Sequence, residues 1–400
     1  MRYRSMWATA LLAASVVARV LWVALSTNGA NFVDLHVYRD GAAGLADGSL
    51  YDFVYHGPTA TPLPFTYPPF AAVVLYPLSL LPWDFVLWAW QFATIAALFA
   101  SVVLAQRLCG RTDGVYAVAA VGTAVAIWCE PVRVTLDYGQ INVFLMLGTL
   151  AAVWWAKTRR GRILGGVLIG LMAAIKLTPA ISALWYPAVR RPLGAIAAAA
   201  SFAATVVGCW AFFPDITKKY FGSLIGDADR IGQPGLVMNQ SLRGALDRVV
   251  GHDVGTGAVW IVAVVVAVAL AVAAWLAVPQ DGGNGRTDGS WLGVLLIIAL
   301  LGLLVSPISW VHHWVWLIPL AVWLGLGPWA RRPGARTLLV CWAVVAGAGV
   351  PWLLRLAEQF DVALPTGVRT VGGALWGLLA LATLAWIAVV GRRTPAVETA

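Results

Sequence analysis

The first residue of this sequence that could do chemistry is Asp34, in the segment Phe32-Val-Asp-Leu-His-Val-Tyr38 that directly follows the first apolar stretch. A carboxylate held where a helix leaves a membrane is partly removed from water, and this raises its pKa towards the range of a general base. An aspartate in this position can also cap a short helix that starts at Leu35. The residues alone leave both roles open.

Four cationic residues could bind a phosphate. Lys176 lies near the end of an apolar segment, where an ammonium needs an anionic partner or a route to the interface by snorkelling. His312 and His313 stand in tandem in Ser306-Pro-Ile-Ser-Trp-Val-His-His-Trp314, and Arg243 lies in another polar gap. An imidazolium there could meet a lipid phosphate, although a lone histidine is more often a packing residue. Adjacent helical residues diverge by about 100°, so the pair is poorly placed to share a metal ion, and we expect none.

A third set of polar and aromatic residues has the hydrogen-bonding groups that sugar hydroxyls need. Its members are His36, Tyr67, Asp137, Tyr138, Gln140, Asn142, Asn239, Gln240 and Trp310. Caps and helix–helix hydrogen bonds explain Gln140 and Asn142 nearly as well. The two prolines of Thr66-Tyr-Pro-Pro-Phe70 favour a rigid structural turn.

The elements that position these residues must be membrane helices. The chain is 60% hydrophobic and 11% charged, with a mean hydropathy of +0.81, which excludes a soluble globular domain and predicts an all-α polytopic membrane protein. Short basic clusters occupy every second gap between apolar stretches: Arg2/Arg4, Arg107/Arg111, Lys157/Arg159/Arg160/Arg162, Arg190/Arg191, Arg286, Arg331/Arg332/Arg336 and Arg392/Arg393. By the positive-inside rule these gaps are cytoplasmic.

This sidedness predicts a plasma-membrane protein with both termini in the cytoplasm and an extracytoplasmic site, because the candidate residues fall in the alternate gaps. The net charge of +9 is then an orientation signal, and nucleic acid is not expected as a partner. The four cysteines form no CxxC pair and are interpreted as packing residues.

A crossing needs roughly 20 helical residues, and thirteen stretches approach this length. They lie near 6–26, 66–82, 85–106, 114–130, 140–156, 163–178, 180–189, 193–213, 258–278, 291–306, 314–330, 337–354 and 371–390. Cytoplasmic termini require an even number, and the proline-rich 66–82 stretch is the weakest, so about twelve crossings are predicted, with 180–189 a short one. We expect a single integral-membrane domain over 1–400, whose outer loops, 27–65, 214–257 and 355–370, form the active-site face.

The chain resembles the family 87 membrane glycosyltransferases of the GT-C fold class in six features and their order. These are Asp34 after the first stretch, TYPP, GQIN, KLTP, NQSLRG and SPISWVHHW. The resemblance implies a polyprenyl-phosphate mannose donor, a mannosylated phosphatidylinositol acceptor and no cofactor. It also implies that Asp34 is the base that deprotonates the acceptor 2-hydroxyl, giving an α-1,2 linkage with inversion. His312, His313, Lys176 and Arg243 would then stabilise the leaving phosphate.

Two alternatives remain. The enzyme class can be the same with polyprenyl-phosphate arabinose as donor, or with lipomannan or another envelope glycan as acceptor, because these choices depend on pocket shape. A lipid or solute transporter is the alternative of another class. Polar groups that crowd one face, and the lack of a visible sequence repeat, disfavour transport.

Overall fold

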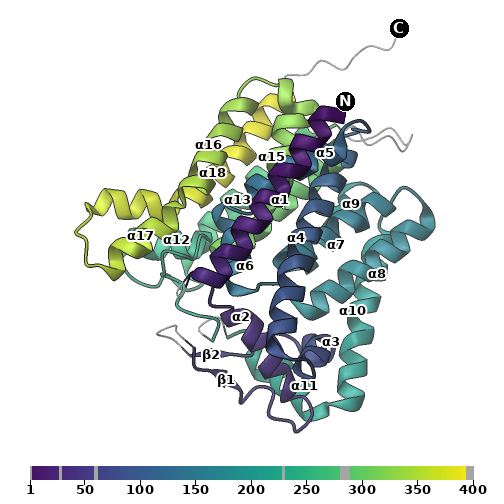
Figure 1. The fold of residues 1–400 in the computed structure, drawn as a ribbon, viewed down its shortest axis with the longest axis vertical. Helices are drawn as coiled ribbons and strands as arrows, with labels where there is room; N and C mark the ends of the chain where they lie inside the picture. The colour runs from purple at the N-terminus through teal and green to yellow at the C-terminus, as the bar shows by residue number, and fades with distance from the viewer. Residues whose placement is uncertain (1, 27–28, 58–61, 228–229, 280–288, 393–400) are drawn as a thin grey trace. The chain divides into compact units, whose positions relative to one another are not determined.

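The computed structural model describes residues 2–26, 29–57, 62–227, 230–279 and 289–392 (Figure 1). Arg286 and Arg393, which belong to the predicted cytoplasmic clusters, lie outside these ranges. Helices make up most of the described chain, and its one small antiparallel sheet pairs β1 (Val54–Tyr55) with β2 (Leu63–Pro64). The predicted all-α class is therefore confirmed, and the chain divides into two compact units.

The first unit comprises residues 1–104, 114–128 and 132–233. Its helices are α1 (Arg2–Leu25), α2 (Val33–His36), η1 (Val37–Gly41), α3 (Pro69–Ser79), α4 (Trp83–Leu108), α5 (Val115–Ala126), α6 (Glu130–Tyr138), α7 (Asn142–Trp155), α8 (Arg159–Ile175), η2 (Thr178–Leu184), α9 (Trp185–Ala188), α10 (Leu193–Phe212), α11 (Pro214–Lys219) and η3 (Tyr220–Leu224). The last residues of α4 and the first two of α6 belong to the second unit.

The second unit contains residues 105–113, 129–131 and 234–400. Its helices are α12 (Leu242–Val250), α13 (Ala258–Ala277), α14 (Ser290–Val305), η4 (Val311–Trp316), α15 (Leu317–Leu326), η5 (Pro328–Arg331), α16 (Ala335–Ala348), α17 (Val350–Gln359) and α18 (Thr366–Arg392). Within this unit α18 packs against α13 and α12, and α16 packs against α15.

Small residues allow α8 and α10 of the first unit to approach closely. A Cβ added at Gly166 would lie 2.1 Å from the carbonyl oxygen of Gly194, and one at Gly170 would lie 2.2 Å from that of Ala198. These two glycines form a GxxxG repeat, in which the missing side chains let helix backbones meet in an apolar environment. The two helices α8 and α10 therefore pack together, and Lys176 is the C-cap residue of α8.

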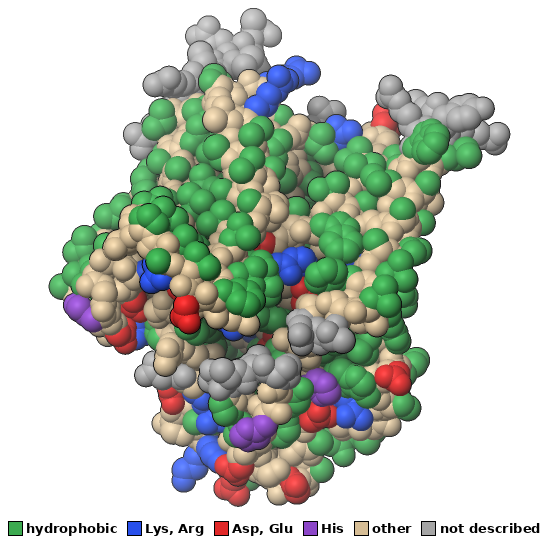
Figure 2. All heavy atoms as spheres, turned by 60° about the vertical axis from the view of Figure 1, so that its left-hand side comes forward, with side chains coloured by type: hydrophobic (Ala, Val, Ile, Leu, Met, Phe, Trp, Pro, Cys, Tyr) green, Lys and Arg blue, Asp and Glu red, His purple; other side chains and the backbone are tan. Residues whose placement is uncertain are grey.

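Six described helical segments are long and apolar enough to cross a membrane: Ser5–Leu25, Trp83–Leu108, Leu193–Phe212, Ala258–Ala277, Ala335–Gln359 and Thr366–Gly391. The fifth of these segments comprises α16 and α17. A seventh crossing results if α5 and α6, which are bent by 73° relative to each other, are taken as one span. Hydrophobic side chains cover much of the face in Figure 2, as a lipid-facing surface requires. Four shorter apolar helices are also present, and twelve crossings and the direction of the termini stay predictions.

Two of the predicted stretches differ from simple crossings. The prediction of one short membrane helix over residues 180–189 is wrong. The 3-10 helix η2 and the four-residue α9 lie there, and both are too short for a hydrocarbon core of about 30 Å. The 66–82 stretch holds α3, an 11-residue helix that starts at Pro69 and contains Pro77. Proline is compatible with a helix start but removes a backbone donor inside a helix, so α3 is short.

Candidate active site

Asp34 is the second residue of α2, and a residue with unusual backbone geometry precedes this helix. Phe32 is the N-cap and has the left-handed φ of 49°, while its backbone N–H donates to the carbonyl oxygen of Asp137 at 2.8 Å. A non-glycine residue in this conformation costs about 1–3 kcal/mol and persists only where its surroundings impose it. Because Phe32 is the cap and no side chain caps the helix, the half-buried Asp34 does not have the capping role that the sequence allowed.

Gly139 brings the Leu136–Asn142 motif against α2. Its φ of 71° suits glycine, and a Cβ at this position would lie only 2.5 Å from the Cβ of Leu35. The neighbouring Gln140 is held by a hydrogen bond from its backbone N–H to the carbonyl oxygen of Thr135 at 2.8 Å. The glycine of GQIN therefore permits the close approach that places Gln140 beside Asp34.

Gln140 connects Asp34 to the other polar residues of the first unit. Its side-chain amide donates a hydrogen bond to the Asp34 carboxylate. Its Oε1 accepts hydrogen bonds from the Tyr38 hydroxyl at 2.8 Å and from Lys176 Nζ at 3.3 Å. With 3% of its surface exposed, Gln140 is a buried amide whose donor and acceptor sides face different partners.

Lys176 follows the last residue of α8 and points into this site. Its Nζ donates to Asn142 Oδ1 at 2.8 Å and lies 5.6 Å from the centroid of the Tyr67 ring. The Tyr67 hydroxyl is 3.1 Å from that of Tyr38. Lys176 is buried, so snorkelling to the interface does not describe it. Asp34, Tyr38, Tyr67, Gln140, Asn142 and Lys176 are called the Asp34 cluster below.

The environment adjusts the acid–base properties of the cluster. Burial raises the pKa of Asp34 to about 6, while the hydrogen bond from Gln140 and the positive charge of Lys176 oppose this shift. Burial also raises the pKa values of Tyr38 and Tyr67, so both phenols stay neutral near pH 7. A carboxylate that is mostly ionised at pH 7, yet more basic than usual, has the properties of a general base.

His36 is enclosed by aromatic rings. Its imidazole is stacked between Trp83 and Tyr55, with ring centroids 3.7 and 4.8 Å away, and its Nδ1 is 3.1 Å from Asp40 Oδ2. Two aromatic rings therefore stack on the His36 imidazole. The sequence prediction did not include Trp83 or Tyr55; an indole at a predicted interface was the signal available for the former.

Asp137 forms a buried ion pair. Its Oδ1 lies 2.5 Å from Arg19 Nη1 and accepts a hydrogen bond from Trp22 Nε1 at 3.3 Å, and its Oδ2 lies 3.1 Å from Arg133 Nη1. With 2% of its surface exposed, Asp137 serves these partners within the protein and does not reach the Asp34 cluster in this structure. Tyr138 ends α6 and is half-buried. The signal for the ion pair was Arg19 itself, since a charge inside a membrane helix needs a partner.

In the second unit Asn239 joins two predicted motifs that are far apart in the sequence. Its Nδ2 donates to the carbonyl oxygens of Pro234 and Pro307 at 2.8 and 3.0 Å. Its Oδ1 accepts from the backbone N–H groups of Ser309 and Ser241 at 2.8 and 3.2 Å. An amide side chain has about four such positions, and all are used here. Asn239 therefore connects the two loops, and its amide has a backbone partner at each of these positions in this structure.

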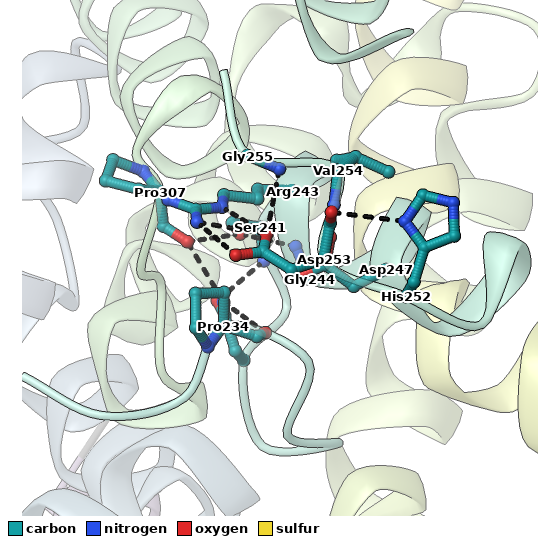
Figure 3. Close-up of polar contacts among 11 residues, drawn as sticks. Pro234, Ser241, Arg243, Gly244, Asp247, His252, Asp253, Val254, Gly255 and Pro307 are labelled. Atoms are coloured by element: carbon teal, nitrogen blue, oxygen red, sulfur yellow. Dashed lines mark hydrogen bonds and ion pairs between the residues drawn. The ribbon is translucent and has the colours of Figure 1, made fainter. Parts of the chain in front are cut away.

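Arg243 is engaged by a carboxylate of its own unit (Figure 3). Its Nη2 donates to both carboxylate oxygens of Asp253, at 3.0 and 2.9 Å, and its Nε donates to Oδ1 at 3.2 Å. The Asp253 side chain is half exposed, so this ion pair lies at the surface. Gln240, the neighbour of Asn239, is buried and donates through Nε2 to the carbonyl oxygen of Val237 at 2.6 Å. A phosphate could reach Arg243 only in competition with Asp253.

His312 and His313 are brought to the same region of the second unit as Asn239. Their rings meet edge to face with centroids 4.8 Å apart, and His312 is 5% exposed. Trp310 pairs with Asn239 in an isolated antiparallel bridge, which fixes the start of η4. Of the four predicted phosphate-binding residues, Lys176 alone belongs to the unit that contains Asp34. Among the described residues no group of three or more His, Cys, Asp or Glu could hold a metal ion.

The model of Glycosyltransferase family 87 matches residues 65–307, more than half of the chain. The chain belongs to glycosyltransferase family 87. The resemblance inferred from the six features is thereby confirmed, and the matched segment contains GQIN, KLTP and NQSLRG. No solved structure matches this family 87 chain.

Several curated proteins are similar to this family 87 enzyme over most of its length. A Mycobacterium tuberculosis (strain CDC 1551 / Oshkosh) protein is 47% identical over 96% of this chain and 88% of its own. A Mycolicibacterium smegmatis protein is 46% identical over 94% and 90%. Both are named polyprenol-phosphate-mannose-dependent alpha-(1-2)-phosphatidylinositol pentamannoside mannosyltransferase. A Mycobacterium tuberculosis (strain H37Rv) protein, 31% identical over 91% and 86%, has the same name with mannoside in place of pentamannoside.

Proposed function

We propose that this enzyme transfers mannose from polyprenyl-phosphate mannose to a 2-hydroxyl of a mannosylated phosphatidylinositol lipid, giving an α-1,2 linkage. The observation that carries this proposal is Asp34, a half-buried carboxylate of raised pKa that Gln140 links to the Lys176 ammonium. Transfer between two lipid-linked substrates needs one group to accept a proton and a cation to offset the charge of the leaving phosphate. The Asp34 cluster contains both kinds of group.

In the proposed reaction the acceptor 2-hydroxyl oxygen attacks the anomeric carbon of the donor. Its proton passes to a carboxylate oxygen of Asp34. The bond from the anomeric carbon to the phosphate oxygen breaks, and its electron pair stays on the polyprenyl phosphate. Attack from the face opposite the leaving group inverts the anomeric centre, so a β-linked donor gives an α-linked product. The Asp34 proton is then released to water, which restores the base.

The roles of the other predicted residues follow from their surroundings. Lys176 is proposed to bind the donor phosphate within the Asp34 cluster. The phosphate-binding role of His312, His313 and Arg243, which belong to the second unit, stays a prediction from the sequence. Tyr67, Gln140 and Asn142 have polar groups in the cluster that suit sugar hydroxyls. Further proposed sugar contacts are His36, Tyr138, Gln240 and Trp310. Asn239 and Asp137 are assigned to structure instead, since their hydrogen bonds and ion pairs serve the protein.

The acceptor and the linkage are proposed from the relatives. Because the two relatives at 46–47% identity are named for a pentamannoside, we propose a phosphatidylinositol pentamannoside acceptor. Purified enzyme should be assayed with polyprenyl-phosphate mannose or arabinose and with phosphatidylinositol mannosides of defined length, followed by linkage analysis of the product. We expect one α-1,2-linked mannose on the pentamannoside. Transfer of arabinose, or transfer only to lipomannan, would replace this substrate assignment.

The proposed orientation places the site on the outer face of the cell membrane. Single cysteines at the exposed positions 225 and 360 of a cysteine-free variant should react with an impermeant thiol reagent added to intact cells. Cysteines at 160 and 333 lie in the basic gaps and should react only after the membrane is permeabilised. Labelling at 160 in intact cells would invert the orientation and move the site to the cytoplasm.

A further inference from the structure

Arg19 is a buried cation six residues before the end of α1, and its side chain contacts α4 and the end of α6. It is 1% exposed, and its Nη1 lies 2.5 Å from Asp137 Oδ1. Its Nε donates to Gln91 Oε1 on α4 at 3.2 Å. A guanidinium inside a membrane helix is costly unless it is paired, so these contacts explain how α1 accommodates Arg19.

Gln91 and Asp137 extend these contacts to the backbone at the end of α6. Gln91 Nε2 donates to the carbonyl oxygen of Leu136 at 2.8 Å. The carbonyl oxygen of Asp137 accepts the hydrogen bond from Phe32 N–H at 2.8 Å. Two consecutive carbonyl groups and one carboxylate are therefore held by hydrogen bonds from α1, α4 and the N-cap residue of α2.

The helix that carries Asp34 cannot move independently of this segment. Phe32, the N-cap of α2, has the left-handed conformation, which the hydrogen bond to Asp137 helps to impose. Gly139 lies so close to Leu35 that an added Cβ would be 2.5 Å from the leucine Cβ. A displacement of the end of α6 would therefore displace α2, which places Asp34 two residues after Phe32.

We propose that Arg19 is a positioning residue for Asp34, which it orients through Asp137 and Gln91. The proposal rests on the proposed role of Asp34 as the base. The attraction within a buried ion pair is largely offset by desolvation, so apolar residues of the same volume often stabilise a protein as well. The effect of Arg19 on the reaction comes instead from geometry, because a displacement of about 1 Å in a reacting group can slow turnover roughly 100-fold.

The test measures kcat, KM and thermal unfolding of Arg19→Met, Asp137→Asn, the double variant and Arg19→Lys, with rates expressed per folded molecule. We expect kcat of each Met or Asn variant to fall about 10- to 100-fold while the donor KM changes less than about threefold. The kcat of the double variant should lie within about threefold of the kcat of the slower single variant, since the two residues act as a unit. Arg19→Lys keeps the charge and should restore kcat to within about tenfold of wild type.

A matched control lies at the other end of α6. Glu130 is also a buried carboxylate, and its Oε1 accepts a hydrogen bond from Trp352 N–H at 2.9 Å within the second unit. Glu130→Gln keeps that acceptor and should keep wild-type kcat. If only one of the Arg19 and Asp137 variants folds, its kcat still shows whether the ion pair positions Asp34 or only stabilises the protein.

Three results would overturn the positioning role. These are wild-type kcat per folded molecule with a lowered unfolding temperature, a raised KM with unchanged kcat, or additive losses in the double variant. Asp34→Asn is assayed in parallel to separate the two proposals. Full activity of Asp34→Asn ends the proposed mechanism, whereas an inactive Asp34→Asn beside fully active Arg19 variants ends the positioning role alone.

Discussion

The Asp34 cluster and the Asn239 region show two different uses of buried polar residues. In the first unit, Gln140 and Lys176 direct their polar atoms at other side chains, and the carboxylate of Asp34 stays half-buried. In the second unit, Asn239 directs all its hydrogen bonds at backbone groups of two loops. A polar side chain that binds backbone fixes the chain path, whereas a network of titratable side chains sets the charge and pKa of its members.

The largest expected effect on turnover is at Asp34, in the first of these two regions. Asp34→Asn keeps size and polarity but removes the proton acceptor, so turnover should fall by roughly 100-fold or more. Expression, thermal unfolding and binding of the donor lipid should change little. The measurement is single-turnover transfer of radiolabelled mannose by the purified variant. A folded Asp34→Asn protein that transfers at the wild-type rate would show that Asp34 is not the base.

Lys176 tests whether the cluster also binds the donor. Lys176→Met keeps a similar length and removes the charge, and loss of a charge-assisted contact of about 1.5–3 kcal/mol corresponds to roughly 10- to 100-fold in kcat/KM for the donor. The acceptor KM should change less.

Lys157→Met is the matched control, because Lys157 Nζ lies 3.4 Å from the centroid of the Trp154 ring in the same unit and outside the Asp34 cluster. Equal losses in the two lysine variants, or unchanged donor kinetics in Lys176→Met, would assign Lys176 to packing. Ala substitution of His312 and of His313 extends the same measurement to the second unit.

The raised pKa of Asp34 predicts the pH dependence of the reaction. A general base must be deprotonated, so activity is present above the pKa and is lost as pH falls through it. With the Asp34 pKa at about 6, kcat/KM at pH 5 should be roughly one tenth of its plateau. The residual rate of Asp34→Asn should lack this acidic limb. An acidic limb that persists in Asp34→Asn would assign the titration to another group.

The smallest expected effect on turnover is at Asn239. Asn239→Ala leaves buried backbone groups unsatisfied, at about 1–3 kcal/mol each, so the thermal unfolding temperature should fall. The kcat per folded molecule should stay within about threefold of wild type, the reverse of the result expected for Asp34→Asn. A normal unfolding temperature combined with a large loss of kcat would return Asn239 to the sugar-binding residues.

The apolar pattern was sufficient to predict most helices. The stretches 193–213 and 258–278 match α10 (Leu193–Phe212) and α13 (Ala258–Ala277) almost residue for residue, because an unbroken apolar run of this length is stable as a helix in lipid. The pattern failed where a helix breaks inside such a run. The 114–130 stretch ends early at Ala126, and α6 then leaves at 73°. Hydropathy averages over a window and contains no information on a bend.

The sequence alone also supplied the candidate residues of the site, because five short motifs and an aspartate after the first stretch are properties of the linear chain. It could not decide the partners. Asp137 looked as suitable for sugar binding as Gln140, yet it pairs with Arg19, which is 118 positions away, while Gln140 turns to Asp34 and Lys176.

The physical reason for this difference is the distance along the chain over which each property acts. Hydrophobicity, charge and backbone preference are carried by single residues or short segments, so the sequence determined the membrane class, most helices and the candidate residues. Which acceptor satisfies which buried donor depends on the packing of segments far apart in the chain, and for Asp34 it depends on the approach of Gly139 to Leu35. Only the tertiary structure decided that Asp34 lies in a network with Lys176, and that Asn239 holds two loops together.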